Sequence, residues 1–549
     1  MMMENFALRP RMWLSGAALA ALLIAGAPMA AHADTPADTL VEGFAIDDII
    51  TMDPAESFEI STAEIIGNTY ELLVRLDLDD TSKVKGDIAE SWTVSDDGLT
   101  YTFKLKPGLK FASGNPITAA DVAWSFERAV KLDKGPAFIL TQFGLTKDNV
   151  TEKAKAADDG TFVFTVDKPY APSFVLNCLS ATVGAVVDKK LVMEHLKPVT
   201  PSDDYKYDND FGNDWMKKHS AGSGPFTLRE WQANQAVVLD RNDNYNGEKS
   251  KLARVIYRHM KESSAQRLAL VAGDIDVARN LEPNDLDAIA DKSGIKTISA
   301  PKGTLYYISL NQKNEKLAKP EVRQAFKYLI NYDAIGKTLI KGIGEIHQTF
   351  LPKGDLGALD ENPFKLDVAK AKELLEKAGL KDGFNVTMDV RNGQPVTGIA
   401  ESIQQTAGQA GIKIEIIPGD GKQTLTKYRA RNHDIYIGQW GQDYFDPNSN
   451  AQTFASNADN SDDGPVATLA WRNAWDIPEL SKQTEAALLE KDSAKRADLY
   501  KDLQKKVLET SPFAIIFQQI EVAAYRDNLK GFKLGPSFDT NFVAPISKD

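Results

Sequence analysis

The stretch that says most about the fold of this 549-residue chain is Ala89-Glu-Ser-Trp-Thr-Val-Ser-Asp-Asp-Gly-Leu-Thr-Tyr-Thr-Phe-Lys-Leu105. Its centre, Asp97-Gly98, predicts a tight turn, because glycine readily adopts the positive φ that such turns need. After the turn, Tyr101 and Phe103 alternate with polar residues, which predicts a strand with one buried face. The stretch therefore predicts a β-hairpin that packs on a core.

Helices are predicted on both sides of this hairpin. Helical periodicity marks the earlier residues from Thr62 to Leu73. Downstream, Thr118 is expected to cap a helix, with Asp121 three residues later as a variant of the capping box. Val122, Phe126 and Val130 then repeat every four residues, so this helix should bury one apolar stripe.

The hairpin and the second helix together resemble family 5 extracellular solute-binding proteins, the dipeptide- and oligopeptide-binding components of ABC importers. The helical string that carries the resemblance is Thr118-Ala-Ala-Asp-Val-Ala-Trp-Ser-Phe-Glu-Arg128. Further blocks agree along nearly all of the chain: Gly222-Ser223-Gly224-Pro225-Phe226, Pro320-x-Val322-Arg323-Gln324-Ala325-Phe326, Ala369-Lys370 with Ala378-Gly379, and Trp440-x-x-Asp443-x-x-Asp446-Pro447.

The resemblance implies an α/β fold with two lobes, the periplasmic-binding-protein fold of type II, in its large form with an extra subdomain in the first lobe. It also implies hinge closure of the lobes over a ligand. Residues 34–300 would then form the first lobe, residues 301–511 the second, and residues 512–549 would return to the first. Pro301 and Pro512 stand at the two boundaries, as is typical of breaks between domains.

Residues 1–33 are predicted to be a secretory signal peptide. Arg9 and Arg11 precede an apolar run from Trp13 to Ala27, and Ala31-His32-Ala33 fits a cleavage site. The run is shorter than the roughly 20 residues that span a bilayer. We therefore expect a protein of the periplasm that has no membrane span after cleavage. The net charge of −13 argues against nucleic acid as a partner.

Sequence signatures of catalysis and of metal binding are missing. The chain has no His-Glu-x-x-His and no Gly-x-Ser-x-Gly motif. Asp240-x-Asn242-x-Asn244 lacks the glycine and glutamate that complete a calcium loop. The single cysteine, Cys178, cannot form an internal disulfide and is expected to be a small buried hydrophobe. We predict a protein that is not an enzyme and that needs neither cofactor nor metal.

A candidate ligand site lies in residues 433–449, where a predicted strand at Ile435–Ile437 runs into a polar, aromatic loop. The resemblance implies that Asp443 holds the α-ammonium of a peptide. It also implies that the loop Trp440-Gly441-Gln442 faces the peptide main chain. The first strand, at Phe44-Ala45-Ile46-Asp47, is expected to add main-chain hydrogen bonds in the manner of an extra strand. Asp446-Pro447-Asn448 is predicted to be a turn.

A ligand carboxylate would need a cation. Arg391 is the candidate, because it follows a predicted strand and the planar guanidinium meets a carboxylate with two hydrogen bonds. Arg429, Arg431 or no cation at all remain alternatives.

The chain is therefore predicted to be a monomeric receptor that passes small peptides to the membrane permease of an ABC importer. The ligand stays open, because the resemblance also covers binders of opines, glutathione, metal chelates and sugars. An exported chaperone or hydrolase on the same scaffold is the remaining alternative.

Overall fold

The computed structural model describes residues 34–549 except 80, 82, 204, 280 and 463–467. The predicted signal peptide lies outside the described residues. Within the described part, no helix is long and apolar enough to cross a membrane.

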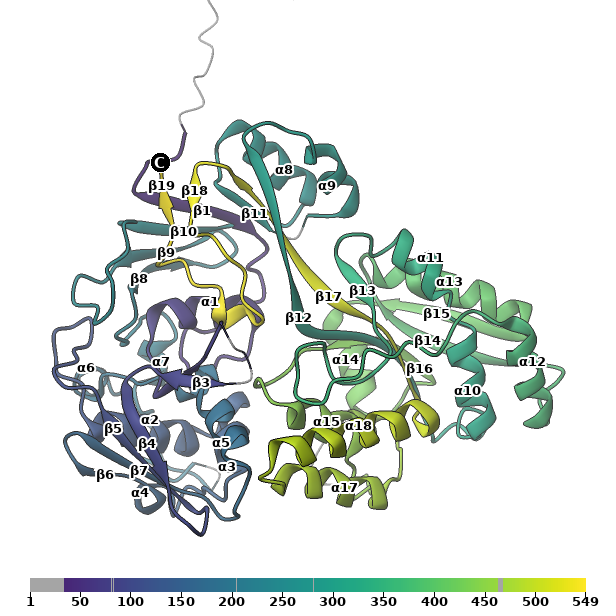
Figure 1. The fold of residues 1–549 in the computed structure, drawn as a ribbon, viewed down its shortest axis with the longest axis horizontal. Helices are drawn as coiled ribbons and strands as arrows, with labels where there is room; N and C mark the ends of the chain where they lie inside the picture. The colour runs from purple at the N-terminus through teal and green to yellow at the C-terminus, as the bar shows by residue number, and fades with distance from the viewer. Residues whose placement is uncertain (1–33, 80, 82, 204, 280, 463–467) are drawn as a thin grey trace, which may run out of the picture.

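One large mixed sheet runs through both lobes (Figure 1), with the strand order β15-β14-β16-β12-β17-β11-β1-β10-β9-β8. The first-lobe half has β1 near its middle, where β1 pairs in parallel with both β10 and β11. The first-lobe elements around this sheet are β1 (Thr39–Phe44), α1 (Ile60–Thr69), β8 (Phe226–Gln232), β9 (Ala236–Arg241), β10 (Arg254–His259), α8 (Ser263–Ala272), β11 (Val277–Arg279) and α9 (Pro283–Ile289).

The predicted hairpin and capped helix are confirmed in the extra subdomain. Strands β4 (Ala89–Val94) and β5 (Thr100–Leu105) pair antiparallel around Gly98, whose φ is 75°. In α2 (Ala119–Leu132), the Asp121 carboxylate accepts hydrogen bonds from the Thr118 backbone N–H at 2.9 Å and hydroxyl at 2.7 Å. The other elements here are β2 (Val74–Leu76), β3 (Val84–Gly86), α3 (Phe138–Thr141), α4 (Val150–Lys153), β6 (Ala154–Asp158), β7 (Thr161–Thr165), α5 (Pro172–Leu179), α6 (Lys189–Met193) and α7 (Asn213–Met216). Cys178 is fully buried in α5, as predicted.

The second lobe is built on three parallel strands. β14 (Phe384–Arg391) pairs in parallel with β15 (Ile412–Gly419), and α13 (Val396–Gln409) connects them. On its other side β14 pairs in parallel with β16 (Ile435–Trp440), so the carboxyl ends of these strands meet at one edge of the sheet. The remaining elements are α10 (Pro320–Tyr328), α11 (Tyr332–Lys337), β13 (Gly344–Ile346), α12 (Val368–Lys377), α14 (Gly421–Arg429), α15 (Pro447–Ala455), α16 (Leu469–Arg472), α17 (Pro478–Leu489) and α18 (Ser493–Thr510).

Two long antiparallel strands, β12 (Ile295–Leu310) and β17 (Phe513–Arg526), connect the lobes (Figure 1). The pairing of β12 with β17 becomes irregular between Pro301 and Leu305, next to the first predicted lobe boundary. The predicted return at residue 512 needs correction. Phe513 packs in the second lobe, whereas Ala523 packs in the first, so the return lies within β17. Pro512 follows the end of α18 and marks the end of a helix instead of a lobe boundary.

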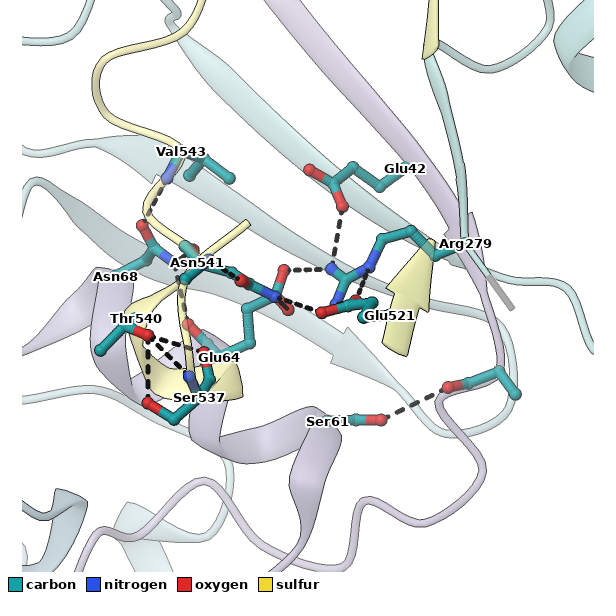
Figure 2. Close-up of polar contacts among 12 residues, drawn as sticks. Glu42, Ser61, Glu64, Asn68, Arg279, Glu521, Ser537, Thr540, Asn541 and Val543 are labelled. Atoms are coloured by element: carbon teal, nitrogen blue, oxygen red, sulfur yellow. Dashed lines mark hydrogen bonds and ion pairs between the residues drawn. The ribbon is translucent and has the colours of Figure 1, made fainter. Parts of the chain in front are cut away.

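The C-terminal segment then folds back over the first lobe, through β18 (Leu529–Lys530), a short 3₁₀ helix (Phe538–Thr540) and β19 (Ser547–Lys548). It is tied to α1 by Asn68, whose amide nitrogen donates to the Asn541 carbonyl at 2.9 Å (Figure 2). The amide oxygen of Asn68 accepts from the Val543 N–H at 2.9 Å. These bonds hold the C-terminal segment against the last turn of α1.

Candidate ligand-binding site

A cavity of about 350 Å³ lies between the two lobes. Both lobes, the connecting strand β12 and the C-terminal segment contribute to its wall. The lining residues are 57–60 and Ala63 at the start of α1, Arg75 and Leu76, 180–182, 302–304 in the irregular part of β12, 439–445 after β16, and 536–540 with Phe542. A volume of this size suits a small molecule, which would contact both lobes at once.

On the second-lobe side, β16 ends in the predicted loop, and Trp440, Gly441, Gln442 and Asp443 all line the cavity. The Trp440 indole N–H is buried and has no partner among the described residues, so it is free to donate to a ligand. Gln442 is engaged elsewhere, because its amide nitrogen donates to the Asp355 carboxylate at 2.6 Å.

The next part of this loop is structural. In the predicted turn Asp446-Pro447-Asn448, the Asp446 carboxylate accepts from the Asn448 N–H at 2.9 Å, and the turn leads directly into helix α15 with Asp446 as N-cap and Pro447 in the first helical position. Both carboxylate oxygens of Asp446 also bind the buried guanidinium of Arg496, at 2.9 and 2.7 Å.

Asp443 carries a side-chain carboxylate that faces no bonded partner in the described structure. Its backbone N–H donates to the Ser449 hydroxyl at 2.9 Å, which fixes the loop. Its carboxylate has no hydrogen-bond partner among the described residues. Burial raises the pKa of Asp443 to about 7, and Arg472 offsets this only in part. A partly dehydrated carboxylate without a cation is a site that a positively charged group would stabilise.

On the first-lobe side, the residues before α1 approach the cavity. Phe58 is 50% exposed, and Glu59 lies beside it at the N-cap position of α1. One oxygen of the Glu59 carboxylate, Oε2, accepts from the Phe58 N–H at 3.1 Å and from the Ser57 hydroxyl at 3.4 Å. Burial raises the pKa of Glu59 as well.

Two basic residues line the cavity, and both are already paired. The Arg75 guanidinium binds Asp87 at 2.6 Å and donates to the Tyr70 carbonyl at 2.6 Å. The Lys302 ammonium binds Glu521 at 2.7 Å and donates to the Gly535 carbonyl at 2.6 Å. Neither is left free for an anionic ligand group.

Through Glu521, Lys302 belongs to a buried charge network between the connecting strands and the first lobe. Figure 2 shows the part of this network around Arg279. The Arg279 guanidinium binds Glu521, Glu64 at 2.6 Å and Glu42 at 3.2 Å. Burial raises the pKa of Glu42 to about 8, so this side chain is mostly protonated at neutral pH. Burial would also raise the pKa of Glu521, but Arg279 and Lys302 outweigh it and lower the pKa to about 2. The network therefore pairs Arg279 and Lys302 chiefly with Glu521, whose pKa these two cations lower, while burial raises the pKa of Glu42 and of Glu64.

The structure does not bring the predicted first-strand residues to the cavity. Phe44 and Ile46 are buried in the first-lobe core, and both edges of β1 are occupied by neighbouring strands. The Phe44 carbonyl accepts from the Met260 N–H at 2.9 Å, and the Ile46 N–H donates to His259 Nδ1 at 3.1 Å. Ala45 accepts from the Ser61 hydroxyl at 3.3 Å, and Asp47 is exposed outside the lining. A ligand strand therefore cannot pair with β1 where β10 and β11 already occupy its edges.

The candidate cations for a ligand carboxylate also lie outside the lining. Arg391 is exposed at the end of β14, with its guanidinium against Gly421. Arg431 binds Asp462 at 2.9 Å and covers the ring of Trp471, and Arg429 is exposed. The structure therefore places Arg391 outside the cavity, because its guanidinium lies against the start of α14.

Sequence reasoning missed the lining residues outside the 440–443 loop, among them 57–60 next to α1 and 536–540 with Phe542 in the C-terminal segment. A signal did exist, because Phe58, Ile60, Phe538 and Phe542 are apolar residues that fit no predicted strand or helix stripe. Their meeting depends on the C-terminal return, which no local pattern reveals.

Two lobes joined by two long strands, with a cavity between them, define a ligand-binding protein that can close by hinge bending. The chain belongs to the bacterial extracellular solute-binding proteins, family 5, whose model matches residues 83–462.

Among curated proteins, the chain is 29% identical to the probable D,D-dipeptide-binding periplasmic protein DdpA of Escherichia coli, over 95% of this chain and 97% of that protein. It is 26% identical to the glutathione-binding protein GsiB of Pectobacterium atrosepticum, over 97% of each. Among solved structures, the periplasmic binding protein DppA of Helicobacter pylori, in complex with the peptide STSA, has a TM-score of 0.77 and 25% identity. That match covers 93% of this chain and 98% of the other.

Proposed function

We propose that this protein is a periplasmic receptor that captures a short peptide between its lobes and delivers it to the membrane permease of an ABC importer, without catalysing a reaction. The observation that carries the proposal is the Asp443 carboxylate, which lines the cavity and forms no ion pair with any described residue. The α-ammonium of a peptide supplies that cation. The names of the relatives, which include peptide-binding periplasmic proteins, support the same ligand class.

The remaining groups suit a peptide main chain. The buried, unpartnered Trp440 indole N–H can donate to a peptide carbonyl. Gly303 and Thr304 lie in the irregular part of β12, where the pairing with β17 is interrupted, so backbone groups there face the cavity. Closure of the lobes would exclude water and strengthen each of these hydrogen bonds.

The test combines mass spectrometry of the small molecules that co-purify with the protein and titration calorimetry with alanine dipeptides and tripeptides. We expect a co-purifying peptide, binding of the free peptides, and a large loss of affinity when the peptide is N-acetylated. A co-purifying opine, sugar or metal chelate, together with no peptide binding, would contradict the proposal. Release of free amino acids from the peptides would show an enzyme instead of a receptor.

A further inference from the structure

The bases that line the cavity have ion-pair partners, whereas two of the lining acids have none among the described residues. Three are acids, Glu59, Asp443 and Asp539, and two are bases, Arg75 and Lys302. Both bases have carboxylate partners outside the lining, as described above. Asp539 lies in the field of these two bases and accepts from Ser537. Glu59 and Asp443 are therefore the two lining acids that no lining base neutralises.

The position of Glu59 shows that its carboxylate is available for a ligand. Glu59 occupies the N-cap position of α1, but its side chain caps no N–H of the helix. Asp48 provides that hydrogen bond instead, because its carboxylate accepts from the Ser61 N–H at 3.1 Å. The Glu59 carboxylate accepts hydrogen bonds from its own backbone N–H and, at Oε2, from Phe58 and Ser57, and none of these donors is a base.

We propose that the cavity selects ligands with two cationic groups, an ammonium at Asp443 and a second cation, such as a lysine or arginine side chain, at Glu59. The proposal rests on the proposed peptide-binding function and names the class of peptide. Asp443 belongs to the second lobe and Glu59 to the first, so a ligand with two cations contacts a carboxylate on each lobe and favours the closed form.

Two phenylalanine rings of the wall already have a cation of the protein over one face, whereas no described residue places one over Phe58. The ring faces of Phe538 and Phe542 are covered by Lys302 and Arg75, with cation-to-centroid distances of 4.8 and 5.0 Å. Phe58 is half exposed, and its ring contacts Phe138 edge-on. Phe58 can therefore pack on the aliphatic part of a basic side chain whose head reaches Glu59.

An acidic side chain on the ligand would be disfavoured. Among the described residues that line the cavity, no unpaired base is present to meet it. It would instead lie near Glu59, Asp443 or Asp539, and like charges in a dehydrated site repel strongly. The cavity should therefore discriminate by charge and not only by size.

The experiment is titration calorimetry with matched peptides. Alanine dipeptides and tripeptides carry lysine, norleucine or glutamate at each position in turn, because norleucine keeps the length of lysine without its charge. We expect the best lysine peptide to bind about tenfold or more tightly than its norleucine match, as a charge-assisted hydrogen bond would produce. The glutamate peptide should bind more weakly than both.

Glu59→Gln keeps an acceptor for Phe58 and removes the charge, so the lysine-to-norleucine ratio should fall to about two or less. The control Glu90→Gln removes the same charge from an exposed position on β4, outside the cavity, and should leave the ratio unchanged. Thermal unfolding of each ligand-free variant verifies that it is folded.

Equal binding of lysine and norleucine peptides, or a lysine preference that survives in Glu59→Gln, would overturn the proposal while peptide binding itself stands. If the wild type binds none of the peptides, the proposed function fails and this inference fails with it.

Discussion

Replacing Asp443 by asparagine removes a charge and keeps the shape of the side chain. If the carboxylate pairs with a peptide ammonium in the closed cavity, truncating this charge pair should cost about 2–5 kcal/mol. At about 1.4 kcal/mol per factor of ten, the affinity for a free peptide should fall roughly 30-fold to a few thousand-fold. N-acetylation of the peptide should weaken wild-type binding similarly and affect Asp443→Asn much less, because its pair is already lost.

The same substitution should have the opposite effect on the stability of the ligand-free protein. Burial raises the pKa of Asp443 from 3.8 to about 7. Between these values the folded state holds a proton that the unfolded state has released, so stability falls as the pH rises from about 4 to 7. Each pKa unit corresponds to about 1.4 kcal/mol. The difference between the folded and unfolded pKa of Asp443 therefore sets an upper limit of about 4 kcal/mol on the gain in unfolding free energy of Asp443→Asn above pH 7. Near pH 4 the gain should vanish.

Calorimetry and pH-dependent thermal unfolding test both parts. The matched control is Asp476→Asn, which removes a carboxylate from an exposed position of the second lobe and should change neither quantity. If Asp443→Asn binds a free peptide as tightly as the wild type does, the carboxylate does not hold the peptide ammonium. A lower melting temperature of the ligand-free variant at pH 8 would refute the burial argument, since it would mean that the carboxylate is held by a stabilising contact.

Below pH 7, the peptide affinity of the wild type should rise by up to about tenfold per pH unit, because Asp443 must lose its proton to bind an ammonium. Above pH 7 the affinity should level off. In calorimetry, Asp443→Asn should show no such dependence on pH. Arg496→Met should lower the free energy of unfolding in urea by about 3–5 kcal/mol, because it leaves the buried Asp446 unpaired, and the double variant with Asp446→Asn should recover much of this loss. Arg391→Ala should change peptide affinity by less than about twofold, since Arg391 lies outside the cavity; a loss as large as that of Asp443→Asn would contradict the placement. Small-angle scattering should show a smaller radius of gyration with ligand, and an unchanged profile at saturation would argue against closure by β12 and β17.

Much of the fold was predictable because its elements are encoded locally. The alternation of Tyr101 and Phe103 and the Asp97-Gly98 turn specify the hairpin, and the spacing of Val122, Phe126 and Val130 specifies α2. These signals act over a few residues and hold wherever the element is placed. Half of the site was predictable for the same reason, since Trp440 and Asp443 stand on one loop at the end of one strand.

The other half of the site depends on which segments meet in space. Phe44 to Asp47 has the pattern of a strand, but pattern alone cannot tell an open edge from one that β10 or β11 already covers. The C-terminal return likewise brings residues 536–542 against the last turn of α1, hundreds of positions away in the chain. The sequence by itself therefore determined the elements, the family resemblance and the Asp443 loop. Only the tertiary structure decided strand order, the occupied edges and the opposing wall with Glu59, because these depend on long-range packing that local periodicity does not encode.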